Sequence, residues 1–200
     1  IEVLIILLSH FLSCEKLPWI RETLKGSPLG FVHFIPFKYC PPTQIDTRNI
    51  DNDKSGNYLK KSIFEKRHNV IKYEIIKDDV DLIQDTLREL SNDSSIDVII
   101  TTGGTGLTGR DNTIDAIKDI SEIEIPGFGE LFRYLSYKKI GTSTIQSRST
   151  AFLVNKKYVF CLPGSTSAVK DAWEQILYYQ LDIRHKPCNF IELIPRLNEK

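Results

Sequence analysis

A buried strand, a glycine-rich loop and a possible helix start follow one another between residues 97 and 111, in the sequence DVIITTGGTGLTGRD. The β-branched run 98–100 is typical of a strand that is buried on both faces, as in a parallel sheet covered by helices. Open α/β sheets bind ligands in the loops at the carboxyl ends of such strands. Glycines there let backbone N–H groups approach an anion, and threonines add hydroxyl donors. The sequence therefore predicts a phosphate-binding loop at Thr102, Gly103, Gly104, Thr105 and Gly106.

The spacing of this loop matches no standard nucleotide motif. It lacks the Gly-Lys-Ser/Thr ending of the ATPase loop, and the dinucleotide pattern G-x-G-x-x-G does not fit either. Glycine-rich turns after strands are also common without any function. Two further features favour a binding role here. One is the acidic Asp111, and the other is a second loop, Pro163-Gly164-Ser165, which follows a strand in the same way.

Length and charge restrict the class of protein. Two hundred residues suit one domain with a substantial core. Lysine plus arginine equals aspartate plus glutamate, 26 of each, and this balance gives no support to a nucleic-acid partner. The four cysteines, at positions 14, 40, 161 and 188, form no C-x-x-C pair. They predict inert thiols in a reducing compartment, rather than disulfides or a zinc site. We therefore expect a cytoplasmic protein.

The amino-terminal stretch IEVLIILLSHFL resembles a signal peptide at first sight. It lacks a basic region and a cleavage site, and it is too short to span a bilayer, so we expect no membrane partner. The chain contains no methionine, even at position 1. This indicates either a missing start or a reading frame opened upstream of the true start. We expect residues 1–33 to be a non-native or disordered extension and residues 34–200 to form the functional domain.

Hydrophobic periodicity predicts alternating strands and helices from residue 51 onward. Helices are expected at 52–68, after Asp78-Asp79, at 111–120, at 130–139 after a turn at 126–129, and after the N-cap Ser165. Strands are expected at 70–76, near the sheet edge, and at 96–102. Two further strands, at 150–154 and 158–162, are expected to form a hairpin. The pattern predicts a three-layer α/β/α sandwich with a mostly parallel central sheet and a small β-hairpin insertion.

Five sequence blocks occur together and in order. They are TTGGTGLTGRD (101–111), PGFGELFR (126–133), GTSTIQSR (141–148), LPGSTSAVKDAW (162–173) and QLDIRHKPCNF (180–190). From about Asp46 to the carboxyl terminus, the chain resembles the MoaB/Mog family of molybdenum cofactor biosynthesis proteins. The last block and the second loop resemble the MoaB branch more than the Mog branch.

This resemblance implies an α/β fold that assembles as a homotrimer or homohexamer and binds molybdopterin, a pterin dithiolene with a terminal phosphate. In the Mog branch, ATP and Mg²⁺ are used to adenylate that phosphate. The family's binding residues correspond by motif to Thr102, Gly103, Gly104, Thr105, Gly106, Asp111, Pro163, Gly164, Ser165, Asp46, Ser55 and Gly56.

The residues agree with adenylyl transfer. This reaction needs two phosphate-bearing ligands held in line, with their charge neutralised by a metal and by N–H dipoles. Two glycine loops can hold them, and Asp111 is the predicted catalytic residue and Mg²⁺ ligand. Two other functions stay open: a non-catalytic oligomeric protein that carries molybdopterin, and a generic nucleotide-binding domain.

Several residues have an alternative structural role. Asp111 can cap a helix, and Asp78 and Asp79 fit caps better than metal ligands. Four further residues can either bind a phosphate or complete a contact between subunits; they are Ser143, Gln146, Ser147 and Arg148.

The chain departs from the family pattern at 37–45, where the family has a central first strand. Pro41 and Pro42 each remove a ladder donor and cannot lie in a central strand, and Ile45 replaces a serine. The segment is therefore interpreted as a degenerate first strand. We hypothesise a local frameshift, since codons for Lys-Tyr-Cys-Pro-Pro can encode Asn-Ile-Ala-Leu-Leu when they are read one base later.

Overall fold

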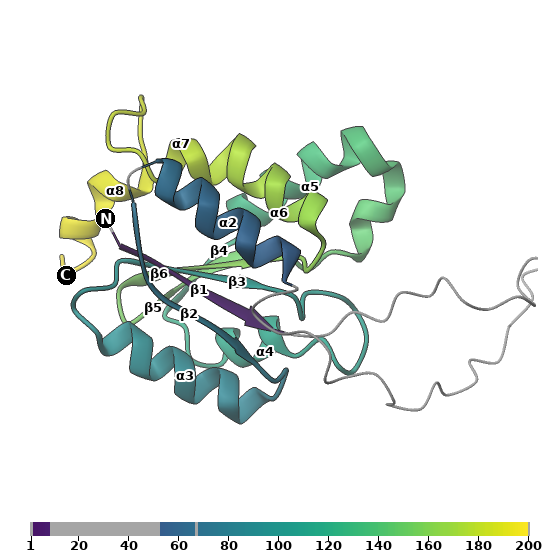
Figure 1. The fold of residues 1–200 in the computed structure, drawn as a ribbon, viewed down its shortest axis with the longest axis horizontal. Helices are drawn as coiled ribbons and strands as arrows, with labels where there is room; N and C mark the ends of the chain where they lie inside the picture. The colour runs from purple at the N-terminus through teal and green to yellow at the C-terminus, as the bar shows by residue number, and fades with distance from the viewer. Residues whose placement is uncertain (1, 9–52, 67, 200) are drawn as a thin grey trace, which may run out of the picture.

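The structure is a computed structural model that describes residues 2–8, 53–66 and 68–199 (Figure 1). Its centre is a six-stranded sheet in the order β2-β1-β3-β6-β5-β4. The strands are β1 (Glu2–Leu8), β2 (Asn69–Ile76), β3 (Val98–Thr102), β4 (Ile123–Ile125), β5 (Thr150–Val154) and β6 (Lys157–Leu162). The pairs among β2, β1, β3 and β6 are parallel, whereas β6–β5 and β5–β4 are antiparallel. The predicted mostly parallel sheet is confirmed.

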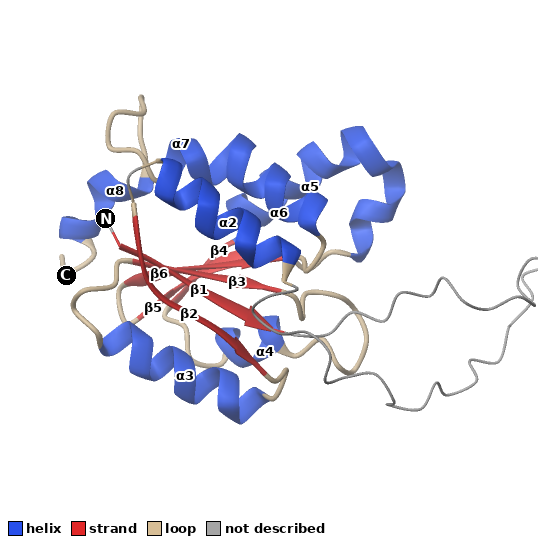
Figure 2. Cartoon of the chain, viewed as in Figure 1, coloured by secondary structure: helices blue, strands red, loops and turns tan. Residues whose placement is uncertain are grey.

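Helices cover both faces of this sheet (Figure 2). The helical segments are α2 (Lys54–Glu65), α3 (Val80–Asn92), α4 (Thr113–Lys118), α5 (Pro126–Ile140), η1 (Gly141–Gln146), α6 (Thr166–Ala172), η2 (Trp173–Leu177), α7 (Tyr178–Gln180), α8 (Phe190–Leu193) and η3 (Ile194–Arg196). Helices α2, α5 and α6 pack on one face, and α3 and α4 pack on the other (Figure 1). This arrangement confirms the predicted three-layer sandwich. Among the described residues, no helix is both long and apolar enough to cross a bilayer.

Strand β3 explains why the layers form on both sides. Successive side chains of a strand point to opposite faces. Val98 and Ile100 therefore join the core under α2, α5 and α6, while Ile99 joins the core under α3 and α4. All five residues of β3 are buried. The uninterrupted apolar run in the sequence is thus the result of packing against helices on both faces.

Strands β3 and β6 end side by side. Their register pairs Val98 with Tyr158 and Thr102 with Leu162, which is the last residue of β6. One residue further, the backbone N–H of Gly103 donates a hydrogen bond of 2.9 Å to the carbonyl of Leu162. The loops that follow the two strands consequently begin at neighbouring points on the same edge of the sheet.

The place between β2 and β3 is taken by β1, at residues 2–8. This differs from the expectation that residues 1–33 lie outside the domain. The segment EVLIILL is apolar after its first residue, and a run of this kind suits a strand with parallel neighbours on both sides. The segment 37–45, interpreted as a degenerate first strand, lies outside the described residues.

The prediction of a turn at 126–129 is wrong, because these residues form the first turn of α5. Pro126 is tolerated there, since the first residues of a helix have no intrahelical partner for their N–H groups. Gly129 is required for close packing, because a Cβ atom at this position would lie 2.3 Å from the carbonyl oxygen of Ser149. The short strand β4, just before α5, has no counterpart in the prediction.

The predicted hairpin is present between β5 and β6. Asn155 and Lys156 form its turn with φ angles of 46° and 64°, which is the left-handed conformation that a two-residue hairpin turn requires. Both strands belong to the central sheet, and β6 joins the hairpin to β3.

Candidate functional site

The glycine loop at 103–106 packs too closely on its neighbours for larger residues. Gly103 and Gly104 have positive φ angles of 103° and 62°, a region that favours glycine. A Cβ atom on Gly104 would lie 1.9 Å from Thr113 Oγ1 and 2.8 Å from Asp78 Oδ2. The glycines therefore let the loop lie directly on the start of α4 and on the segment before α3.

The second loop, at 163–165, leads from β6 into α6. Ser165 is the N-cap of α6, and its hydroxyl accepts a hydrogen bond of 3.4 Å from the N–H of Ala168. The hydroxyl of Ser55 on α2 donates a 2.9 Å hydrogen bond to the carbonyl of Gly164 and lies 3.1 Å from the hydroxyl of Thr166. Ser55 thus supports the second loop from α2.

The two loops meet in one cavity of about 330 Å³. Its other wall consists of α5 and η1. The lining residues are Gly103, Gly104, Thr105, Gly106, Asp111, Phe132, Ser136, Ile140, Ser143, Thr144, Gln146, Ser147, Pro163, Gly164, Ser165 and Ala168. A cavity of this size, in which apolar side chains lie beside hydroxyl, amide and carboxylate groups, suits a small molecule that has both apolar and polar parts.

The wall formed by α5 was missed at the level of sequence. Phe132, Ser136 and Ile140 lie four residues apart along α5 and all line the cavity. Residues at this spacing share one face of a helix, so the periodicity contained a signal. Ser143, Gln146 and Ser147, which were predicted to bind a phosphate or to contact another subunit, also line the cavity.

Asp111 lies in the wall of the cavity and not at a helix cap. Its Oδ2 atom accepts hydrogen bonds of 2.9 Å from the N–H of Thr108 and 2.6 Å from the hydroxyl of Thr108. The N-cap of α4 is Asn112, which makes no side-chain cap bond. The capping role considered for Asp111 is therefore not observed.

Asp78 and Asp79 have different roles. Asp79 is the N-cap of α3, and its Oδ1 atom accepts a 3.0 Å hydrogen bond from the N–H of Leu82. Asp78 is no cap: its Oδ1 atom accepts a 3.3 Å hydrogen bond from the N–H of Asn112, and its Oδ2 atom lies against Gly104. The prediction that both residues are caps is wrong for Asp78, which places a second carboxylate under the glycine loop.

Three predicted site residues that the structure describes, Thr102, Ser55 and Gly56, do not line the cavity. Thr102 is the last residue of β3, is fully buried, and has no hydrogen-bond partner for its Oγ1 atom in the described part of the chain. Gly56 is buried in α2. Asp46 lies outside the described residues. Over residues 2–8, 53–66 and 68–199, no group of three or more histidine, cysteine or acidic side chains forms a metal cluster.

Cys161 on β6 lies near the second loop, but its thiol is unreactive. It is fully buried, and burial raises the pKa of its thiol to about 12. A thiol that stays protonated is a poor nucleophile and a poor metal ligand. The inert state expected for the cysteines is confirmed for Cys161. Cys188 is free and exposed, and positions 14 and 40 lie outside the described residues.

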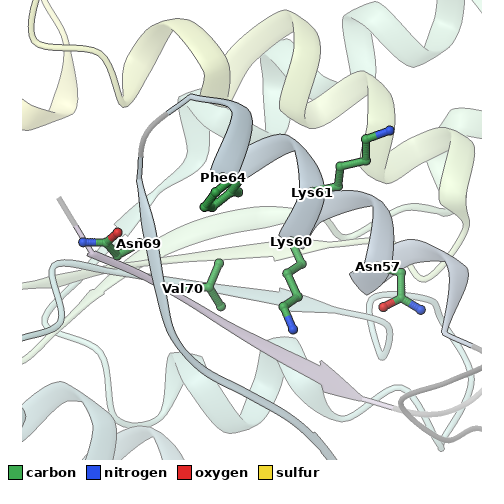
Figure 3. A pocket seen from close by; sticks show the side chains of 6 residues that line it. All are labelled: Asn57, Lys60, Lys61, Phe64, Asn69 and Val70. Atoms are coloured by element: carbon green, nitrogen blue, oxygen red, sulfur yellow. The ribbon is translucent and has the colours of Figure 1, made fainter.

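A second hollow, of about 640 Å³, lies at α2 and the start of β2 (Figure 3). It is lined by Asn57, Lys60, Lys61, Phe64, Asn69 and Val70. Within the described part of the chain, this lining includes no predicted site residue, no glycine and no carboxylate. The smaller cavity at the strand ends is therefore the candidate site.

Comparisons with known proteins match most of the chain. Residues 43–183 match a family described as a probable molybdopterin binding domain. Molybdenum cofactor biosynthesis protein B of Escherichia coli K12 is 41% identical over 157 residues, which cover 78% of this chain and 92% of that protein. The protein of the same name from Bacillus subtilis 168 is 41% identical over 140 residues, covering 70% of this chain and 82% of the relative.

Solved structures are similar over the whole length of the chain. A crystal structure of molybdenum cofactor biosynthesis protein B superposes with a TM-score of 0.73 at 30% identity, covering 100% of this chain and 97% of the other. The tungsten cofactor synthesizing protein MoaB from Pyrococcus furiosus superposes with a TM-score of 0.65 at 28% identity, covering 99% and 97%.

Proposed function

Because this chain belongs to the MoaB/Mog family of molybdenum cofactor biosynthesis proteins, we propose that its cavity binds molybdopterin and that the protein adenylates the terminal phosphate of molybdopterin, using ATP and Mg²⁺. Its role in molybdenum cofactor biosynthesis follows from the family. The binding and the transfer reaction are the proposed part.

One observation carries this proposal. Two loops from neighbouring parallel strands, at Gly103–Gly106 and Pro163–Ser165, border the same cavity as Asp111. Adenylyl transfer requires two phosphate-bearing ligands to be held together, and a site made of two such loops offers a place for each. The apolar side chains of Phe132 and Ile140 on the opposite wall suit the ring system of a pterin.

In the proposed reaction, an oxygen of the terminal phosphate of molybdopterin attacks the α-phosphorus of ATP. A P–O–P bond forms, and the bond from the α-phosphorus to pyrophosphate breaks. No protein nucleophile is needed, so the chain contributes position and charge neutralisation. Gly103 and Gly104 line the cavity with backbone in positive-φ conformations, and Ser165 lies at the start of the helical segment beginning with α6.

Mg²⁺ fits the residues present. This ion is usually held by one or two carboxylates together with phosphate oxygens. Asp111 lines the cavity, and Asp78 lies against Gly104 on the other side of the loop. Asp111 would hold the ion together with phosphate oxygens, because Asp78 does not line the cavity. When bound, Mg²⁺ supplies positive charge to the phosphates.

The experiment incubates the purified protein with molybdopterin, ATP and Mg²⁺ and measures adenylated pterin and pyrophosphate. We expect Asp111→Asn to abolish product while molybdopterin binding persists. Asp119→Asn is the matched control, because Asp119 ends α4 outside the cavity and its replacement leaves turnover unchanged. Loss of product in both variants, or in neither, contradicts the role of Asp111.

A non-catalytic oligomeric carrier of molybdopterin is the second candidate, and an exposed apolar surface supports the oligomeric state proposed for it. Leu131, Tyr134, Tyr137 and Ile140 on α5 and Ile145 on η1 are each more than 40% exposed. Large apolar patches of this kind mark association surfaces, and a homotrimer or homohexamer would cover them. Molybdopterin binding without product supports the carrier. Binding of ATP without any affinity for the pterin supports a generic nucleotide binder instead.

A further inference from the structure

Arg148 lies two residues before β5 and bonds to the glycine loop. Its Nε donates a 2.7 Å hydrogen bond to the carbonyl of Gly106, and its Nη2 donates a 2.5 Å bond to the carbonyl of Asp111. Its Nη1 contacts both carboxylate oxygens of Asp115, at 3.0 and 2.8 Å. In addition, the backbone N–H of Arg148 donates a 2.9 Å bond to the carbonyl of Thr105.

We propose that Arg148 is a positioning residue for the reaction, which holds the two ends of the turn 106–111 together and thereby fixes the Asp111 carboxylate at the cavity. The inference rests on the proposed function. It differs from both roles predicted for Arg148 from sequence, because in this role the guanidinium binds acceptors of its own chain.

The turn itself needs such a tether. Leu107, Thr108 and Gly109 are exposed, so little packing holds them. Within the turn, Asp111 bonds to Thr108, but these bonds only fix the turn to itself. Arg148 links the turn to the sheet, because it bonds to the carbonyls of Gly106 and Asp111, which are the first and last residues of the turn.

The chemistry of the side chain explains why arginine is suited to this position. A guanidinium is a rigid planar fork whose donors point in fixed directions, whereas a lysine ammonium offers donors from a single nitrogen. Acceptors on three separate residues can therefore each bind a different nitrogen of the fork, whereas a lysine would have to reach all three from one atom. Asp115 is largely exposed, so its ion pair with Arg148 contributes little energy. Its effect is to orient the fork toward the two carbonyls.

The test separates geometry from charge. Arg148→Lys keeps the positive charge and loses the fork, and Arg148→Ala loses both. Arg110→Gln is the matched control, because it removes a positive charge from the same turn at a residue that lies outside the cavity lining. We expect both Arg148 variants to lower kcat by about 10²-fold, the order of loss that a displacement of about 1 Å causes. Molybdopterin affinity and the melting temperature should change much less in these two variants. The kcat of Arg110→Gln should be close to that of the unmodified protein.

Two further readouts exclude a merely structural role. Guanidinium ion at a non-denaturing concentration should restore turnover to Arg148→Ala but not to Asp111→Asn. Amide hydrogen exchange of residues 103–111, measured without ligand, should become faster in Arg148→Ala and not in Arg110→Gln. Full activity of Arg148→Lys, an equal loss in Arg110→Gln, or a loss of binding as large as the loss of kcat each overturns the inference.

The activity of the unmodified protein distinguishes a failure of the proposed reaction from a failure of the role proposed for Arg148. If the unmodified protein forms no adenylated product, the proposed reaction is wrong, and hydrogen exchange of 103–111 still decides whether Arg148 fixes the turn. If the unmodified protein is active and Arg148→Ala equals it in kcat, only the inference about Arg148 fails.

Discussion

Thr113 Oγ1 lies 1.9 Å from the point at which a Cβ atom on Gly104 would have to lie. Thr113 is the first residue of α4 and is fully buried, so it has no room to move aside. The closeness of the glycine loop to α4 therefore depends on the missing side chain of Gly104.

Gly104→Ala should destabilise the protein by about 1–3 kcal/mol, because it combines a strained positive φ with a steric clash. Urea unfolding measures the free energy. Gly109→Ala, in the same loop region, is the control, since a Cβ atom there would meet nothing within 4 Å, and it should change the free energy by less than about 0.5 kcal/mol. Equal unfolding midpoints for the two variants would show that the loop does not pack on α4 in this way.

Two glycines in the first turn of α5 should respond in opposite ways to alanine. A Cβ atom on Gly129 would lie 2.3 Å from the backbone oxygen of Ser149, whereas one on Gly127 would meet nothing within 4 Å. Gly129→Ala should lower the free energy of unfolding by about 1–3 kcal/mol, because α5 must move away from the strand it covers. Gly127→Ala should leave it unchanged or raise it by up to about 1 kcal/mol, because alanine is the better helix former. Thermal or urea unfolding compares them, and a loss of stability in Gly127→Ala contradicts the prediction.

Ser55→Ala should weaken the second loop. The variant loses the 2.9 Å bond to the carbonyl of Gly164, which is worth about 1 kcal/mol, and the loop becomes less fixed. Molybdopterin binding, measured by isothermal titration, should weaken. Ser62→Ala on the same helix is the control, because Ser62 is also buried in α2 but lies about two helical turns further along it than Ser55. Equal affinities for the two variants contradict the role of Ser55.

Stability at high pH should depend on Tyr158. Burial raises the pKa of its phenol to about 12 from 10.0, and its hydroxyl has no hydrogen-bond partner within the described residues. A folded-state pKa above the unfolded value gives stability that is present below pH 10 and is lost as the pH rises toward 12. Tyr158→Phe should therefore flatten the fall of the unfolding free energy between pH 10 and 12 and cost little at neutral pH. Identical pH profiles refute this expectation. Cys161 titrates over a similar range and contributes to both proteins.

The elements that sequence predicted well are those with a strong local pattern. The run at β3, the amphipathic stripe of α3 and the N-cap Ser165 each depend on neighbours in the chain, and each is present in the structure. β4 is only three residues long and is formed through its pairing with β5. Such a short strand has no periodicity of its own, so its position could not be predicted locally.

The candidate site also contains residues whose role could be predicted from local sequence and residues whose role could not. The two loops could be predicted because glycine, proline and serine have strong backbone preferences. The roles of Asp78 and Arg148 could not, because both depend on which distant backbone groups come near them. Asp78 contacts Asn112, 34 residues away, and Arg148 contacts Gly106, 42 residues away. The spacing of Phe132 and Ile140 on α5 indicated a helix face, but not the cavity that this face borders.

The hydrogen bond from the N–H of Gly103 to the carbonyl of Leu162 has a consequence for how a ligand enters and leaves. It joins the first residue of the glycine loop to the last residue of β6, so the starts of both loops are held at the edge of the sheet. The facing wall, α5 and η1, belongs to an outer helical layer. We therefore expect that, when a ligand enters or leaves, the loop side of the cavity keeps its shape and the side formed by α5 and η1 moves.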